Sequence, residues 1–406
     1  MSSYNFFAER SFERYKKSDL TFLISVILLL GLGIFTLFFS SQNYAMRIFD
    51  DSFYFVRRQL VCISIGILLF LVLAFVPLEL IKKSIPVIFA VTLVLCILTC
   101  IPGISIEKNG ARRWIKMPFG FTLQTSELVK FTIIIFLANF FDKQASIPNP
   151  EDRNVASGVF VMLLFVGFVL GQKDFSTSLF IFCICCAFFW LCGMKIKWIW
   201  IIGIIGIGFS VFFIVTEEYR MERIIAFLNP TEKQQTSNFQ SLAAKRAISS
   251  GGLLGAGIGT SLVQSNSIPE VHSDYIFASW SEAMGFFGVL AYFSVLVLFA
   301  ARGTIIALHC TNRFAAFASF GFVFSIVAQS LMNCGVVCGL LPSTGIPLPF
   351  FSLGGSSIIV TLAMCGFVLN ASRANTENEI EVKVSDNYTE FTNIDSIDDI
   401  VGETYE

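Results

Sequence analysis

Three titratable side chains lie within five residues of one another, at Glu270, His272 and Asp274. Asp274 stands at the edge of a long apolar run, where partial loss of hydration would make its carboxylate a stronger proton acceptor. The same stretch also fits a structural role, because Ser273 or Asp274 could cap the helix that the apolar run predicts. It therefore offers either a general base or an ordinary helix start.

Arginine residues recur where predicted helices meet polar loops. Arg58 stands at the head of an apolar run, and Arg113 lies in the basic stretch 110–116. Arg223 belongs to an amphipathic stretch over 217–228 that could lie along a membrane surface. Guanidinium groups bind phosphate in a bidentate manner, and they also anchor proteins to lipid headgroups. Both interpretations stay open for Arg58 and Arg113.

Glu127 and Lys130 stand three residues apart, on one face of a predicted helix within an apolar region. A charged side chain inside a membrane span costs about 2.5–3.5 kcal/mol on insertion scales, so it usually faces a partner or a cavity. One interpretation is a mutual ion pair that holds the helix in the bundle. The other is that Lys130 faces a polar cavity and offers its charge to a phosphate while Glu127 orients it.

Two segments contain too many glycine or proline residues to be regular helices. The segment 251–259 has five glycines, and its backbone N–H groups could approach a diphosphate. It lacks the terminal Gly-Lys-Ser/Thr of a P-loop and any surrounding βαβ unit. The segment 339–357, which includes Ser356, carries no charge. At membrane depth such irregular backbone must be buried or line a cavity, so we expect a re-entrant loop beside a ligand path.

The composition shows which elements must position these residues. Of 406 residues, 55% are apolar and 14% charged, whereas a soluble domain has about 25% charged residues. The apolar residues form runs long enough to cross a bilayer as helices. The sequence therefore predicts an all-α polytopic membrane protein with about ten transmembrane helices. These spans lie near 20–41, 58–77, 84–102, 124–141, 156–172, 176–193, 197–216, 274–300, 314–338 and 352–372.

The predicted organisation has three parts. Residues 1–19 form a cytoplasmic segment, and 20–373 form the membrane domain, with a long extracytoplasmic loop over 217–273 between the seventh and eighth helices. Residues 374–406 carry ten acidic residues against one lysine, which predicts a disordered cytoplasmic tail. Without this tail the net charge is +8, which favours an anionic lipid or a phosphate-bearing partner.

The distribution of basic residues predicts how the chain is oriented in the cytoplasmic (inner) membrane. Four of them precede the first span and indicate that both termini are cytoplasmic. On that topology 14 Lys and Arg lie inside, 13 lie outside and Lys130 lies within a span. Either the topology is inverted or an anionic ligand binds on the outer face. We favour the ligand, because the outer residues cluster beside the motif-like stretches.

Cysteine and histidine usage excludes some classes of site. Ten of the eleven cysteines lie in or at the ends of apolar runs, and the C-x-x-C spacing at 183–186 lies within such a run. This pattern is typical of small buried side chains rather than a disulfide framework. With two histidines in the chain, a zinc site is not expected.

Four motifs, in this order, resemble those of the SEDS family of bacterial cell-wall proteins, the FtsW/RodA/SpoVE group. They are Gly-Ala-Arg-Arg-Trp-Ile at 110–115, Ser-Glu-Leu-x-Lys at 126–130, Pro-Glu-x-His-Ser-Asp-Tyr-Ile-Phe-Ala at 269–278, and the segment from Gly-Leu-Leu-Pro to Gly-Gly-Ser-Ser at 339–357. The resemblance covers about residues 20–372. The Arg112-Arg113 pair favours the division type, FtsW, over the elongation type, RodA.

The resemblance implies a peptidoglycan glycosyltransferase that polymerises lipid II outside the cytoplasmic membrane. It would work with a class B penicillin-binding protein and other divisome or elongasome membrane proteins, and not with nucleic acid. Asp274 matches the family's essential aspartate and would be the general base. Arg58, Arg113, Lys130 and Arg223 would bind or neutralise the leaving pyrophosphate. The expected substrate-binding set also includes Glu127, Glu270, His272 and Ser356.

The resemblance implies no certain cofactor, although a divalent cation (Mg or Mn) near Asp274 is possible. The sequence departs from the usual motifs at a few positions: Thr125, Lys173, Gln264, Ala283 and Leu353. The change at Gln264 removes a lysine that usually adds an outer phosphate contact. Alternative functions are an elongation-type polymerase, a lipid II flippase, which charged residues within spans would suit, and a scaffold that only recruits the penicillin-binding protein.

Overall fold

The structure is a computed structural model that describes residues 18–108, 111–117, 122–147, 155–191, 193–194, 196–228, 239–258 and 272–392. These residues form twelve helices and three short strands. The elements are α1 (Leu20–Phe49), α2 (Tyr54–Phe75), α3 (Leu78–Cys100), β1 (Ser105–Lys108), β2 (Ala111–Lys116), β3 (Thr122–Gln124), α4 (Thr125–Ala145), α5 (Ala156–Gly171), α6 (Phe175–Leu191), α7 (Ile196–Val215), α8 (Glu218–Leu228), α9 (Phe239–Gly251), α10 (Ile276–His309), α11 (Arg313–Val337) and α12 (Gly355–Thr392).

The predicted fold class is confirmed, because every predicted span contains one helix. Among the described residues, seven helices are long and apolar enough to cross a membrane. The apolar helices α5 and α6 are shorter, with 16 and 17 residues, and α4 has 21. The chain is thus an all-helical protein of the multi-span membrane type. The sequence did not predict the small sheet β1–β3, nor α9 within the long loop.

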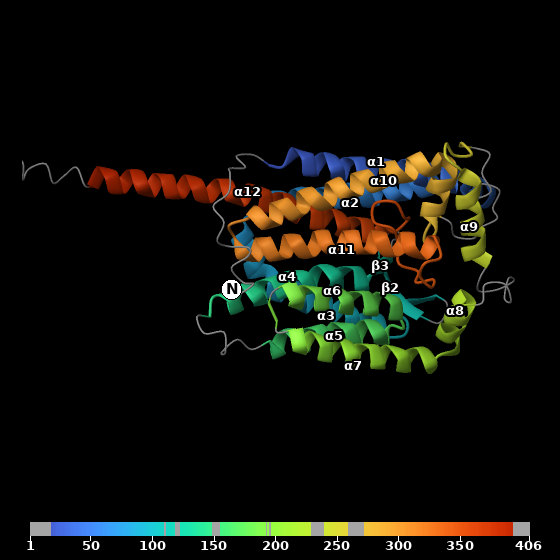
Figure 1. Ribbon diagram of the computed structural model, residues 1–406, viewed down its shortest axis with the longest axis horizontal. Coiled ribbons are helices and arrows are strands. Elements are labelled where there is room, and N and C mark those ends of the chain that lie inside the picture. Colours follow the sequence, from blue (N-terminus) through green and yellow to red (C-terminus); the bar gives the residue numbers. More distant parts are fainter. Residues whose placement is uncertain are drawn as a thin grey trace, which may run out of the picture.

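The long helices lie side by side along one direction, with α11 near the middle of the bundle (Figure 1). The helices α8 and α9 and the strands gather at one end, which we call the loop end (Figure 1). At the opposite end, the start of α1 meets α10 and α12. There the Arg302 guanidinium pairs with Asp19 at 2.6 Å, and the Asp19 backbone N–H donates to Ser372.

Small residues bring α2 and α12 into close contact. A Cβ atom at Gly366 would overlap the carbonyl oxygen of Phe70, and one at Gly66 would press on Leu362. Close approach through glycine is a common way to associate helices in membranes, where no hydrophobic effect drives them together. The Asn370 amide then ties the helices by donating to the carbonyl oxygens at the end of α2.

The three strands form an antiparallel sheet in the order β1-β2-β3 between α3 and α4. Ser105 pairs with Ile115, and Trp114 pairs with Gln124. Because successive side chains of a strand point to opposite faces, Arg112 and Arg113 are directed to different sides of β2. The sheet therefore decides which of the two adjacent arginines faces the interior of the loop end.

The helix α10 is broken at Gly285, whose φ of 63° is outside the helical range. The glycine-rich segment after α9 packs against this break. The N–H groups of Ala256 and Gly257 donate to carbonyls of α10, and Phe286 N–H donates to Gly252 at 3.0 Å. The described part of this segment, up to residue 258, thus completes the backbone bonding of α10. The N–H groups of Ala256 and Gly257 are therefore not available to the diphosphate that the sequence suggested.

The connection between α11 and α12, residues 338–354, is irregular, as the sequence predicted, and its second half, 346–352, is largely buried. Leu348 and Phe351 are 1% and 0% exposed. Phe350 has a φ of 67°, and the chain doubles back there against Gly33 of α1. We call residues 338–354 the α11–α12 connection.

The last helix continues to Thr392, into the segment for which the sequence predicted disorder. Nucleating a helix is the costly step, and α12 is already formed and packed where this segment begins. Extending α12 into this segment therefore requires little intrinsic helix propensity. Residues 393–406 lie outside the described part.

Replacing Gly33 by alanine should destabilise the protein, because the new methyl group would overlap the carbonyl oxygen of Phe350. Overpacking of this kind costs about 1–3 kcal/mol. A lower thermal unfolding temperature of the purified protein in detergent would confirm it. Gly31, two residues earlier, is the matched control, because no atom lies within 4 Å of its added Cβ. Equal unfolding temperatures for Gly33→Ala and Gly31→Ala would contradict the packing of the connection on α1.

Candidate active site

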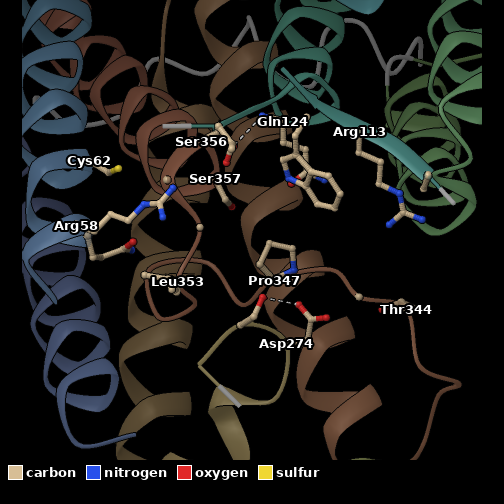
Figure 2. Close-up of a pocket in the computed structure, with 18 of the residues that line it drawn as sticks. Arg58, Cys62, Arg113, Gln124, Asp274, Thr344, Pro347, Leu353, Ser356 and Ser357 are labelled. Atoms are coloured by element: carbon tan, nitrogen blue, oxygen red, sulfur yellow. Dashed lines mark hydrogen bonds between the residues drawn. The ribbon is translucent and has the colours of Figure 1, made fainter. Parts of the chain in front are cut away.

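A cavity of about 320 Å³ lies at the loop end, where elements distant in sequence converge. It is lined by the start of α2, strand β2, helix α8, the residues before α10, the α11–α12 connection and the first turn of α12. Figure 2 shows Arg58 and Arg113 on opposite sides of this cavity, with Asp274 between them. The predicted site residues Arg58, Arg113, Arg223, Asp274 and Ser356 all line it.

Asp274 lies two residues before α10, and the apolar start of that helix anchors it. Ile276 and Phe277 are 0% and 2% exposed, so the chain position of Asp274 is held by packing. Its Oδ1 accepts a hydrogen bond from the Ser273 hydroxyl at 3.0 Å. On the other side, a Cβ added at Gly345 would lie 3.6 Å from its Oδ2. The carboxylate therefore stands at the cavity wall, next to the α11–α12 connection.

A second cavity of about 270 Å³ adjoins the first. Both cavities are lined by Arg223, Asp274, Thr344 and Gly345. The second one is otherwise lined mainly by neutral side chains and backbone, with Glu222 as an added carboxylate. Asp274 therefore stands where the two cavities meet.

The turn between α5 and α6 holds Arg113 in place. One guanidinium nitrogen donates to the Lys173 carbonyl at 2.9 Å, and another lies 3.6 Å from the buried Asp174 carboxylate. Lys173 has a φ of 59°, which turns its carbonyl toward the sheet side. Asp174 also caps α6, since it accepts from the Thr177 N–H at 3.4 Å. Local spacing does not reveal this ion pair, because it joins positions 61 residues apart.

The other cavity residues are fixed by backbone contacts. Arg223 of α8 donates to the Ser343 carbonyl at 3.1 Å, which links α8 to the α11–α12 connection. The Ser356 hydroxyl accepts from the Gln124 N–H at 3.1 Å, which links α12 to β3 (Figure 2). The first residues of α12 thus face the cavity, and helix N-termini favour anions. Sequence reasoning missed Gln59 and Thr344, two buried or half-buried polar cavity residues.

A fourth arginine stands near the cavity wall. Arg220 of α8 lies over the Phe175 ring at 5.1 Å. Burial lowers the pKa of Arg220, Glu217 raises it and the positive charge of Arg113 lowers it. Arginine stays protonated at neutral pH even so. The effect of the Arg113 charge on the pKa of Arg220 indicates that the cations of β2 and α8 lie near one another.

Glu127 and Lys130 form the ion pair that the sequence offered as one of two alternatives. Lys130 Nζ lies 2.9 Å from the Glu127 carboxylate and donates to the Gln329 side chain, and both charged side chains are 3% exposed. Neither is among the residues that line the two cavities. Their position favours a structural role in joining α4 to α11.

His272 lies beside aromatic rings rather than in a cavity lining. Its ring stacks on Phe55 at 4.7 Å and lies 5.3 Å from Tyr44, and its carbonyl accepts from the Leu353 N–H. The residue thus ties the approach to α10 to the start of α2. Glu270, the other predicted residue of this motif, lies outside the described residues.

The described residues contain no group of three or more His, Cys, Asp or Glu that could hold a metal ion. Asp274 and Glu222 are the carboxylates that line the second cavity. Magnesium ions need six oxygen ligands and often take several from substrate phosphates. These two carboxylates do not by themselves make a closed protein site for a divalent cation.

Comparisons with known proteins bear on the role of this site. Residues 20–377 match the model of one protein family, described as a cell cycle protein of the FtsW, RodA and SpoVE type. The chain is 35% identical over 359 residues to stage V sporulation protein E of Bacillus subtilis strain 168, covering 87% of this chain and 97% of that protein. It is 34% identical over 362 residues to a probable peptidoglycan glycosyltransferase FtsW of Borreliella burgdorferi, covering 88% and 97%.

Solved structures share the fold over nearly the same length. A chain from a peptidoglycan synthase complex, whose structure concerns the coordination of polymerization and crosslinking, is 26% identical with a TM-score of 0.71. The match covers 88% of this chain and 98% of that one. The rod shape determining protein RodA of Thermus thermophilus is 24% identical with a TM-score of 0.66, covering 89% and 98%.

Replacing Lys130 by methionine should strongly destabilise the protein, because it leaves the Glu127 carboxylate buried without its cation. Breaking a buried pair from one side costs about 3–5 kcal/mol. The double variant Lys130→Met/Glu127→Gln should recover part of the loss in thermal unfolding temperature. The exposed pair of Arg57 and Asp51 provides the control, since Arg57 is 71% exposed. If Lys130→Met lowers the unfolding temperature no more than Arg57→Met does, the pair has no structural role.

Proposed function

Because the chain belongs to the FtsW/RodA/SpoVE family of cell cycle proteins, we propose that it is a peptidoglycan glycosyltransferase that polymerises lipid II during cell division. Support comes from relatives that carry the FtsW name at 31–34% identity over nearly their whole length. The observation that carries the proposal is the position of Asp274, a carboxylate at the junction of two cavities with three arginines in the lining.

The proposed reaction joins two lipid II molecules through a new glycosidic bond. Asp274 takes the proton from the 4-hydroxyl of the acceptor GlcNAc as that oxygen attacks the anomeric carbon of the donor. The bond between this carbon and the pyrophosphate oxygen breaks, and its electrons leave with undecaprenyl pyrophosphate. A positioned base typically contributes a factor of about 10²–10⁴ to the rate. The proton remains on Asp274 until solvent removes it.

The two cavities differ in a way that suits the two substrates. The first contains Arg58, Arg113 and the start of α12, all of which favour the pyrophosphate of the donor. The second is lined by Gln240 and Ser343, whose neutral groups suit the hydroxyls of a sugar acceptor. Positive groups placed before the reaction stabilise the developing charge on the leaving group at little cost in reorganisation.

The proposed orientation puts the loop end outside the cytoplasmic membrane and both termini inside the cell. The cavities and the basic residues of β2 and α8 then face the compartment where glycan strands form. A class B penicillin-binding protein is the proposed partner, by analogy with the synthase complex that contains the solved relative. The flippase hypothesis loses its main argument, because Glu127 and Lys130 pair with each other and are not among the cavity-lining residues.

Replacing Asp274 by asparagine should reduce lipid II polymerisation at least 100-fold, because an amide cannot accept the hydroxyl proton. The test is glycan-strand formation by the purified full chain, with and without a class B penicillin-binding protein. Asp51→Asn is the control, an acidic residue outside the cavity linings that pairs with Arg57 at 3.3 Å. Wild-type turnover in the Asp274→Asn protein would refute the proposed base. Flipping of lipid II without polymerisation by the wild type would refute the proposed function.

Replacing Arg113 by lysine should raise the KM for lipid II about tenfold, because lysine keeps the charge but loses the planar fork held by Lys173 and Asp174. Arg113→Met should have a larger effect. The neighbouring Arg112 is a matched control, since it pairs with Glu107 at 3.1 Å and is not among the cavity-lining residues. Steady-state kinetics at several lipid II concentrations give the KM of the Arg113 and Arg112 variants. If Arg112→Lys and Arg113→Lys change KM equally, the sheet does not select between the two arginines.

A further inference from the structure

A single amide on α11 joins the two chain segments that enclose the proposed base. Asn333 is 2% exposed, and its Nδ2 donates to the backbone carbonyl of Asp274 at 3.0 Å and to that of Ile346 at 2.8 Å. These carbonyls belong to segments 59 and 13 residues away along the chain. The amide thus uses both of its hydrogens on backbone atoms, each in a different wall of the site.

Both bonded segments bear directly on the carboxylate. The first bond holds the main chain of Asp274 itself, just before α10. The second holds Ile346, and the preceding residue, Gly345, has a φ of 71° and approaches Asp274 Oδ2 so that an added Cβ would lie 3.6 Å away. Displacing either segment would change the place of the carboxylate relative to both cavities. Asn333 therefore sets the spacing between the base and the connection that faces it.

The geometry points to Asn333 as a positioning residue for Asp274, an inference that rests on the proposed function. A general base must come within about 2.6–3.2 Å of the oxygen whose proton it takes. A displacement of about 1 Å can reduce the rate about 100-fold without removing a catalytic group. Asn333 touches no reacting atom in this proposal, and its effect on turnover passes through Asp274.

A neighbouring amide has a separate role. Gln329, one helical turn earlier on α11, donates to the Pro347 carbonyl at 2.8 Å and accepts from Lys130. It holds the same connection, but it binds the ion pair rather than the base. The Asn333 Oδ1 has no hydrogen-bond partner among the described residues. An apolar replacement of similar size therefore removes the two donated bonds, and its effect can be assigned to Nδ2.

The chain offers a closely matched control at the opposite end of the bundle. Asn370 of α12 is 8% exposed, and its Nδ2 donates to the carbonyls of Leu73 and Val76 at 2.7 and 2.6 Å. Replacing Asn370 by leucine also removes two hydrogen bonds donated to backbone carbonyls, as Asn333→Leu does. A purely structural role for Asn333 predicts that both variants behave alike.

The test compares Asn333→Leu and Asn370→Leu in lipid II polymerisation by the full chain with its penicillin-binding partner. We expect kcat to fall at least tenfold for Asn333→Leu with KM within twofold, and both constants to stay within twofold for Asn370→Leu. Asn333→Ser, whose hydroxyl can donate one of the two bonds, should have an intermediate kcat. If Asn333→Leu does not fold, the comparison of Asn333→Ser with Asn370→Leu tests the inference instead. Equal kcat values for the 333 and 370 variants, or a loss confined to KM, would overturn the inference.

A second measurement does not depend on activity. Hydrogen–deuterium exchange of peptides that cover 272–275 and 339–352 should speed up in the position 333 variants and stay at the wild-type rate in Asn370→Leu. Unchanged exchange would overturn the proposed tether. A wild-type protein that does not polymerise lipid II would instead refute the proposed function, and the exchange rates would then still decide whether Asn333 holds the two segments.

Discussion

Backbone that leaves the helical conformation within a membrane bundle must find hydrogen-bond partners inside the protein, because the hydrocarbon offers none. The α11–α12 connection meets this constraint with side-chain amides. Gln59 donates to the Ser352 carbonyl at 3.3 Å, and Gln329 and Asn333 donate to Pro347 and Ile346. The connection can therefore be irregular enough to form a cavity wall and still be held. The broken helix α10 solves the same problem with the glycine-rich backbone after α9.

The distribution of charge follows a related constraint. The ionised side chains of Glu127 and Lys130 are buried together, which limits the cost of removing them from water. Arg113 also has a buried carboxylate partner, but its own side chain is 25% exposed at the cavity wall. The first arrangement joins helices, whereas the second presents a cation to a ligand. Burial therefore separates the structural lysine from the arginine proposed to bind substrate.

The site illustrates how much the sequence could predict. Asp274, Arg58, Arg113, Arg223 and Ser356 were selected by residue type and motif, and the structure brings them into one cavity lining. Lys130 and His272 came from the same motifs, yet one lies in an ion pair and the other against aromatic rings. A motif records which residues occur together in the chain and does not record which way each side chain points. The roles of Asp174 and Asn333 depend on contacts across 61 and 59 residues, which local spacing does not reveal.

The sequence by itself determined the membrane class, the ten long apolar segments and the family resemblance, because hydrophobic length and local motifs are properties of contiguous residues. It also indicated that the charge-free segment 339–357 must be buried or line a cavity, since exposed irregular backbone is not tolerated in lipid. The tertiary structure alone decided that Arg113 is held at the cavity wall by Lys173 and Asp174, and that Asp274 stands between two cavities. These facts depend on the register of a small sheet and on the meeting of helix ends, where distant segments are held by a few hydrogen bonds.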